Sequence, residues 1–388
     1  MATDSHLNPS AEGSFDRAFR EYGGRLDLST VHPTTRDGMQ GLLDYYRWLL
    51  NAARFADPPY NPTGNLTVDF VDNAEVNATA FVSNQLELIG INWGLVALIY
   101  QAFYLLMSSP TVLPNIGDAE VEKAEKRNID ALLQPQSWKL MESLLPKDGD
   151  RVRVAQHLAW NAMAFVFAHE VSHVCRAHLR YLKTTFGIDR HVEYRTVRLS
   201  ESQARTLQAL ELDADTAAAE TNLILWTKLC RRGTFPLLTE VPPLTTWSLS
   251  LSMFFHVLDM KTKPHESALR SHPKPAVRLL QVSYNASDCF GELEFPDAHR
   301  CIGEGWGIIG KWWQQNELSA HSLWELDEHL DRTIDTLNEL RSESGELIGV
   351  LRQLAEERNH DIRMRKKYDN HILNTEPNKT DAGDVMLT

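Results

Sequence analysis

The order of apolar and polar residues changes along the chain from a strand pattern to a helix pattern. Three segments, LTVDFV, ATAFVS and LELIGI, alternate apolar and polar positions or are rich in β-branched residues, and short polar turns separate them. They predict a small antiparallel β-meander within residues 65–92. Upstream of it, residues 38–55 have apolar positions at helical spacing and are followed by two prolines, so a helix is expected there.

The rest of the chain mostly has the spacing of helices. Gly187 is expected to cap the C-terminal end of one helix, and Ser200 with Gln203 predicts a capping box at the start of another. Helices are therefore expected over residues 138–145, 152–185, 200–230, 245–260 and 275–284.

One apolar run, residues 88–107, is almost long enough to span a bilayer. Asn92 and Gln101 interrupt it, Glu87 precedes it, and no cluster of Lys or Arg flanks it. A strand end followed by a buried helix is therefore expected, and association with a membrane is not. A membrane-associated protein anchored by this run is the alternative that the pattern leaves open.

Past residue 310 the character of the chain changes. Leu and Ile recur at three- and four-residue spacing among many charged residues from Leu323 to Leu354, which predicts an amphipathic helix or helical hairpin. Such a stripe either packs on the main domain or forms a surface for a regulatory partner or for self-association, and the packed helix is favoured. We therefore divide the chain into a disordered tail, a main domain, a helical region and a second disordered tail, at residues 1–15, 16–310, 311–372 and 373–388.

Composition narrows the class of protein. The chain has 388 residues, of which 39 are Lys or Arg and 52 are Asp or Glu, so its net charge is −13. That charge argues against a nucleic-acid partner, which needs a basic face. The four cysteines have no paired spacing and the N-terminus has no basic-then-apolar signal pattern. Together these features predict a cytoplasmic protein in a reducing compartment.

The strongest chemical signal lies in residues 165–175, FVFAHEVSHVC. On a helix, His169 and His173 are four residues apart and share a face, so both imidazoles can bind one metal ion. Glu170 then lies beside that ion, where it can take a proton from a water molecule. The same motif occurs by chance in unrelated helices, so a third ligand is needed before it indicates a zinc site.

A third ligand is available on the next long predicted helix, in the segment ELDAD. Glu211 completes a set of two histidines and one glutamate, and it leaves the fourth position open to water. Asp215 lies four residues further on the same face, where it can accept a hydrogen bond from a ligand imidazole and fix its tautomer. The alternative is a solvated acidic helix, but the surrounding alanines predict close packing and favour a buried site. His178 would face away from the metal on a continuous helix, so it is not counted as a ligand.

In this arrangement the chain resembles the gluzincin metallopeptidases, in particular the HtpX and CAAX-prenyl endopeptidase type. In that group HExxH is followed by a helix that bears Glu-x-x-Ala-Asp, and residues 211–215 match that pattern. Asn77 and Ala78 resemble the strand that precedes the active helix. His272, followed by proline, and Arg278 resemble a downstream His-Pro…Arg element.

The resemblance implies an α+β, mostly helical fold, in which a zincin-like domain has the meander before the HExxH helix and a C-terminal helical region follows. It implies one Zn²⁺ per chain, held by His169, His173 and Glu211. The implied activity is that of an endopeptidase that hydrolyses peptide bonds in a protein or peptide substrate. Zinc lowers the pKa of a bound water, and Glu170 acts as the general base. His178 adds some likeness to the Lit-like phage-exclusion peptidases.

Two further roles follow from the resemblance. His272 or Arg278 is expected to act as a catalytic residue that stabilises the oxyanion. The strand at Asn77 and Ala78 is expected to bind an extended peptide by adding it to the edge of the sheet, main chain to main chain. The alternative function is a catalytically silent or regulatory interaction protein that acts through its C-terminal helices. In a regulated protease, those helices or the loop at residues 261–275 would cover the cleft.

Overall fold

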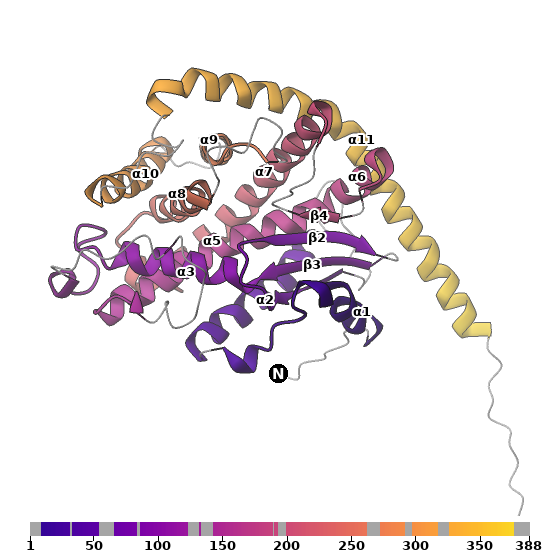
Figure 1. Ribbon diagram of the computed structural model, residues 1–388, viewed down its shortest axis with the longest axis horizontal. Helices are drawn as coiled ribbons and strands as arrows, with labels where there is room; N and C mark the ends of the chain where they lie inside the picture. Colours follow the sequence, from indigo (N-terminus) through magenta and orange to yellow (C-terminus); the bar gives the residue numbers. More distant parts are fainter. Residues whose placement is uncertain are drawn as a thin grey trace, which may run out of the picture.

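The structure is a computed structural model of a mostly helical molecule with one small mixed sheet (Figure 1). Residues 138–142 of one expected helix and residues 262–271 of the expected covering loop lie outside the described part of the chain. The structure describes residues 9–31, 33–53, 66–83, 86–122, 132, 143–188, 190–192, 199–261, 272–291, 297–316 and 326–375.

The helices confirm most of the predicted helical segments. The capping box at Ser200 is present, since its hydroxyl accepts from the backbone of Gln203 and the Gln203 side chain accepts from the backbone of Ser200. The described helices are α1 (Pro9–Phe19), α2 (Pro33–Ala53), α3 (Trp93–Met107), α5 (Gly149–Cys175), α6 (His178–Phe186), α7 (Glu201–Arg231), α8 (Pro243–Lys261), α9 (Pro275–Gly291), α10 (Ala298–Gln315) and α11 (Leu326–Thr375).

The sheet contains the three predicted strands, but it is not an antiparallel meander. Strands β1 (Leu66–Val71), β2 (Ala78–Ser83) and β3 (Leu86–Asn92) are joined by a short edge strand, β4 (Arg190–Val192), in the order β1-β3-β2-β4. β1 pairs with β3 in parallel, whereas β2 is antiparallel to both β3 and β4. β3 is buried on both of its faces over its second half, so it takes the central place and β1 lies beyond it. Alternation along each strand predicts the strands but not their order.

The N-terminal region is more ordered than the sequence pattern indicates. α1 begins at Pro9, inside the segment expected to be disordered. Phe15 and Phe19 of α1 are buried against Val71 and Leu88 of the sheet, with the two phenylalanine rings 4.3 Å apart. Two aromatic side chains at helical spacing bury enough apolar surface to hold this short helix on the sheet.

The apolar run at residues 88–107 forms the end of β3 and then α3, as predicted. All of α3 after its first residue is buried in the main core, packed on α5 and α8. A helix that is apolar on every side is accommodated because other elements surround it. Within the described ranges, no helix combines the length and the apolarity that crossing a membrane requires.

The helix that carries HExxH is shorter than predicted. The expected helix over residues 152–185 is divided into α5 and α6, because Ala177 adopts a left-handed backbone conformation with a φ of +63°. Neither glycine nor proline marks this break in the sequence. α6 ends at Gly187, which has a φ of +67° and caps the helix as expected.

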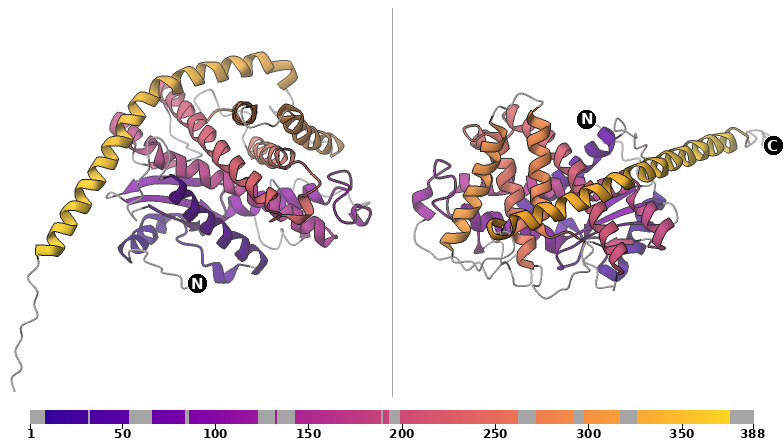
Figure 2. Two further views of the ribbon diagram at one scale, coloured as in Figure 1. Left: turned by 180° about the vertical axis from the view of Figure 1, so that it is seen from behind. Right: turned by 90° about the horizontal axis from the view of Figure 1, so that it is seen from above.

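The C-terminal boundary also differs from the prediction. Residue 310 lies within α10, which packs against α8 and α9, so α10 belongs to the main domain. α11 is one helix of 50 residues that crosses α7 and α9 and continues past α6 (Figure 2). It extends to Thr375, into the segment expected to be a disordered tail. Its buried Leu337, Leu340 and Leu351 pack on the main domain, as the favoured interpretation of the leucine stripe predicts.

Candidate metal centre

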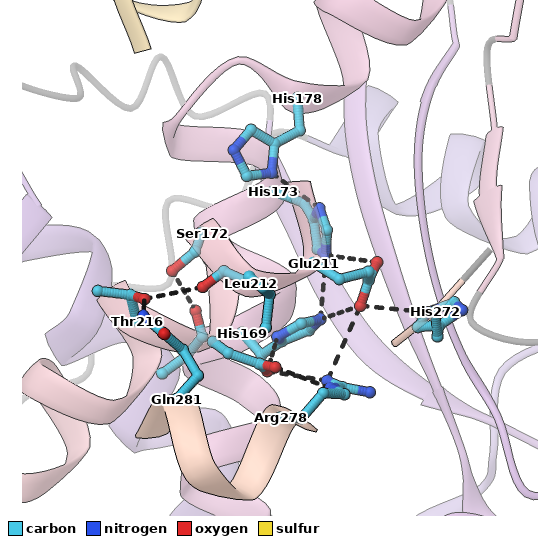
Figure 3. Close-up of polar contacts among 12 residues, drawn as sticks. His169, Ser172, His173, His178, Glu211, Leu212, Thr216, His272, Arg278 and Gln281 are labelled. Carbon is cyan, nitrogen blue, oxygen red and sulfur yellow. Dashed lines mark hydrogen bonds and ion pairs between the residues drawn. The ribbon is translucent and has the colours of Figure 1, made fainter. Parts of the chain in front are cut away.

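The two motif histidines and Glu211 converge where α5 packs against α7 (Figure 3). The two imidazoles approach each other through their Nε2 atoms, which are 3.0 Å apart. Glu211 Oε2 lies 3.3 Å from His169 Nε2, and Glu211 Oε1 lies 3.4 Å from His173 Nε2. All three side chains are buried, and together they can hold a metal ion.

The spacing of these donor atoms fits a tetrahedral metal ion. Zinc–nitrogen and zinc–oxygen distances of about 2.0–2.2 Å correspond to a tetrahedron whose edges are about 3.3–3.6 Å long. The three separations of 3.0, 3.3 and 3.4 Å, which join the two Nε2 atoms to each other and each of them to a different oxygen of Glu211, are similar in length to such edges. Two imidazoles and one carboxylate also form the donor set of hydrolytic zinc sites. The identity of the ion is not fixed by this geometry, because imidazole and carboxylate also suit other divalent metals.

Nδ1 of His169, which points away from Glu211, contacts the buried carboxylate of Asp215, and this carboxylate is held by the guanidinium of Arg278. His169 Nδ1 lies 2.9 Å from Asp215 Oδ1, as predicted for Asp215. Arg278 holds both oxygens of Asp215, through Nε at 2.7 Å and Nη2 at 2.8 Å. Burial opposes ionisation of Asp215, but Arg278 and His169 outweigh it and lower the pKa of this carboxyl. A permanently charged guanidinium thus keeps the carboxylate ionised in a site that excludes water.

The charges of Asp215 and Glu211 also change the pKa of the His169 imidazole. Burial disfavours protonation of His169, but Asp215 and Glu211 outweigh this effect and raise its pKa to about 10. Without a metal, one proton on this imidazole therefore balances part of the negative charge. A metal ion that binds through His169 Nε2 displaces a proton.

Nδ1 of His173, which points away from Glu211, contacts His178, a residue that was not expected at the centre. His178 Nδ1 lies 3.0 Å from His173 Nδ1, and His178 Nε2 lies 2.9 Å from Asp213 Oδ2. Arg176 holds Asp213 through Nε and through Nη2, the latter at 2.8 Å. The expectation that His178 faces away was wrong because the helix is not continuous at Ala177. His178 contacts a ligand residue and is not itself a member of the three-residue donor set.

Glu170 is buried beside the ligand histidines. It follows His169 on α5, and only 3% of its surface is exposed. The residue that the sequence predicts as the general base is thus an interior residue of the helix that carries both histidines.

The two candidates for oxyanion stabilisation are close to the centre but have different partners. His272 Nε2 lies 3.2 Å from Glu211 Oε2, and its side chain is 11% exposed (Figure 3). Arg278 is nearly buried and directs Nε and Nη2 at Asp215, with Nη2 also 3.8 Å from Glu211 Oε2. These contacts make Arg278 part of the support of His169, so His272 is better placed to meet a substrate.

The predicted peptide-binding edge is partly occupied by the chain itself. β4 pairs with β2 at Thr79, Ala80 and Phe81, so this stretch of β2 is not an open edge. Ala78 is buried and pairs with Ile91, and the backbone oxygen of Asn77 accepts a hydrogen bond from Asn92. The expectation of an open strand edge did not take account of β4, because a strand of three residues leaves no recognisable pattern in the sequence.

Two residues of the centre, Arg176 and Asp213, were given no role from the sequence, and His178 was considered but not counted as a ligand. Asp213 had a signal, since it is the third acidic residue within five in an alanine-rich helix. The sequence indicates a role for His178 only if the helix is assumed to break before it. No protein-family model matches the chain, and neither a curated protein nor a solved structure is significantly similar to it.

Proposed function

We propose that this protein is a metal-dependent hydrolase, and that it acts as a zinc endopeptidase on protein or peptide substrates. One observation carries the proposal: two imidazoles and a carboxylate meet at spacings of 3.0–3.4 Å in the interior, with Glu170 on the same helix turn. Burial of so many charged groups is costly unless they serve a ligand or pair closely. A peptide bond is the proposed target because the motif order resembles that of the gluzincins.

The residues of the centre have different roles in the proposed hydrolysis. His169, His173 and Glu211 would hold the ion, which when bound acts as a Lewis acid and makes a water molecule more acidic. The Glu170 carboxylate accepts the proton of the attacking water and delivers it to the amine nitrogen that leaves. His272 Nε2 donates a hydrogen bond to the oxygen on which negative charge develops.

The first test separates metal binding from chemistry. Glu170→Gln keeps the shape of the side chain but cannot accept a proton, so it should retain the metal content of the wild type and lose cleavage of labelled casein. Glu211→Ala should lose the metal as well. Glu201→Gln, at the exposed start of α7, is the matched control and should change neither quantity. Metal content is measured by elemental analysis of protein purified without added metal.

Each variant can contradict the proposal. Full cleavage by Glu170→Gln would remove this residue from the mechanism. Unchanged metal content in Glu211→Ala would place the third ligand elsewhere. A folded wild type that neither contains zinc nor takes it up would leave the donor set as a buried ion-pair cluster.

The second candidate function is an interaction protein that acts through α11. It is favoured by three apolar side chains on this helix, Ile334, Ile348 and Val350, which are 40–47% exposed. Because α11 covers α7 and α9, removal of the whole helix would also disturb the metal centre. Ile348→Asp with Val350→Asp avoids that difficulty, and loss of a binding partner with unchanged metal content would support this function.

A further inference from the structure

The break between α5 and α6 redirects His178 onto the metal centre. On a continuous helix, a residue five positions after His173 would lie about 140° around the axis from it. Ala177, with a φ of +63°, turns the chain so that His178 Nδ1 comes within 3.0 Å of His173 Nδ1. A left-handed conformation is unfavourable for alanine because its Cβ comes too close to the following carbonyl oxygen. The contact between the imidazoles therefore exists against the local preference of the backbone.

The contacts of His178 define which nitrogens carry protons when the centre holds an ion. His173 presents Nε2 to the donor set, so its Nδ1 carries the hydrogen and donates to His178 Nδ1. His178 then carries its own hydrogen on Nε2, which donates to Asp213 Oδ2 at 2.9 Å. Each imidazole donates once along this series, and both stay neutral. The chain of contacts thus fixes a single tautomer for His173.

Asp213 and Arg176 anchor this series at its outer end. Arg176 binds both oxygens of Asp213, and its side chain is 37% exposed, whereas that of His178 is fully buried. Arg176 donates to both carboxylate oxygens, and the same Oδ2 also lies 2.9 Å from His178 Nε2. Asp213 is therefore held in place as the acceptor for His178. The guanidinium supplies the counter-charge from the surface side.

We propose that His178 is a positioning residue that fixes the tautomer and the direction of the His173 imidazole, with Asp213 and Arg176 as its anchor. This inference rests on the proposed function only in requiring that His169, His173 and Glu211 bind a metal ion. Partners behind a ligand imidazole commonly change metal affinity about 10–100-fold. The Asp215–Arg278 pair supports His169, and His178 gives His173 an equivalent support from a different element.

The deciding experiment compares two substitutions of His178. In His178→Gln the amide oxygen can accept from His173 and the amide nitrogen can donate to Asp213, whereas His178→Phe keeps the ring volume and loses both bonds. Zn²⁺ affinity of the full chain is measured by competition with a chromophoric chelator. His178→Phe should bind Zn²⁺ about 10–100-fold more weakly than the wild type. His178→Gln should restore most of that affinity, and the Co²⁺ absorption spectrum should show the same order.

A second pair of variants covers the case in which His178→Phe does not fold. Arg176→Gln removes the partly exposed anchor and should weaken Zn²⁺ binding several-fold. Arg180→Gln is its control, because Arg180 lies four residues further on α6 and pairs with Glu357 of α11 at 3.9 Å, and it should not weaken binding. Circular dichroism and thermal unfolding of the metal-free variants show how much of any effect comes from stability.

The outcomes separate this inference from the proposed function. A wild type that binds Zn²⁺ tightly, with unchanged affinity in His178→Phe and Arg176→Gln, would overturn the role of His178 alone. Equal weakening by His178→Gln and His178→Phe, in proportion to lost stability, would make His178 a packing residue. A folded wild type without Zn²⁺ affinity would overturn both proposals.

Discussion

His169 and His173 of the candidate metal centre have different surroundings from His256, another buried histidine. His169 and His173 have carboxylates and another imidazole within hydrogen-bonding or ion-pairing reach, and a guanidinium pairs with those carboxylates. His256 on α8 is also buried, but its Nδ1 donates to the backbone oxygen of Ser252 at 2.7 Å and its ring lies 5.0 Å from that of Trp313. The pKa of His169 is raised to about 10, whereas burial lowers that of His256 to about 4.

The difference shows that burial alone does not identify a functional histidine. Both kinds of imidazole are removed from water to a similar extent. What distinguishes the candidate metal centre is that carboxylates lie at both nitrogens of His169 and at Nε2 of His173, an arrangement that is costly to bury unless it is completed by close pairing or by an ion. His256 donates to the backbone oxygen of Ser252 and packs against the ring of Trp313.

The largest expected effect comes from removing the charge behind His169. Arg278→Met retains the length of the side chain but leaves Asp215 buried without its guanidinium. Loss of one partner of a buried pair costs about 3–5 kcal/mol of unfolding free energy. Urea unfolding of the metal-free protein measures this cost, and zinc affinity should fall with it.

An exposed ion pair provides the control for Arg278→Met. Arg300 on α10 pairs with Asp297 and Glu304 at the surface, so Arg300→Met should leave stability and zinc affinity unchanged. If Arg278→Met were as harmless as Arg300→Met, the contrast between the metal centre and an ordinary ion pair would disappear.

The next effect concerns His256 and pH. The folded protein keeps this histidine neutral down to about pH 4, whereas the unfolded chain protonates it near its usual pKa of 6.5. Its contribution to stability is therefore complete above pH 6.5 and is lost as the pH falls towards 4. The full loss is about 3 kcal/mol.

The acid sensitivity is measured as a difference between two proteins. Urea unfolding of the wild type and of His256→Gln at pH 7 and at pH 4.5 separates this group from the carboxylates, which titrate in both. The wild type should lose more stability than the variant over this range. Parallel losses would mean that His256 is not buried as a neutral group.

A smaller effect on stability is expected from a substitution in α11, where this helix covers α7. Leu340 of α11 is buried with Leu212 and Val277, which lie next to Glu211 and Arg278 in the sequence. Leu340→Ala leaves a cavity in this small cluster and should cost about 2 kcal/mol. It should also weaken zinc binding, since α7 and α9 lose a shared support. Val350→Ala, at a site that is 47% exposed on α11, is the control and should have no effect on zinc.

The sequence predicted the donor set because its information is local and periodic. His169, His173, Glu211 and Asp215 each follow from four-residue spacing on a helix. The contact of His178 with His173 could not be predicted in this way. It depends on the left-handed conformation of Ala177, and no glycine or proline in the sequence indicates a break there. A residue forced into an unfavourable conformation by tertiary contacts is beyond the reach of local propensity.

Strand order and segment boundaries were predicted less well for a related reason. The alternation along β1 shows which face is buried but not which strand is its neighbour, so the parallel pairing with β3 was missed. The predicted disordered tail, residues 1–15, includes the first part of α1, whose order comes from the packing of Phe15 and Phe19 on the sheet. Pairing and docking are properties of the assembled chain.

The position of α11 has a consequence for the order in which the molecule is made. α7 and α9, which carry Glu211, Asp215 and Arg278, leave the ribosome before the helix that covers them. Until α11 follows, Leu212 and Val277 lack the leucines that bury them in the finished protein. A nascent chain that already contains the whole candidate donor set thus still lacks the helix that covers it.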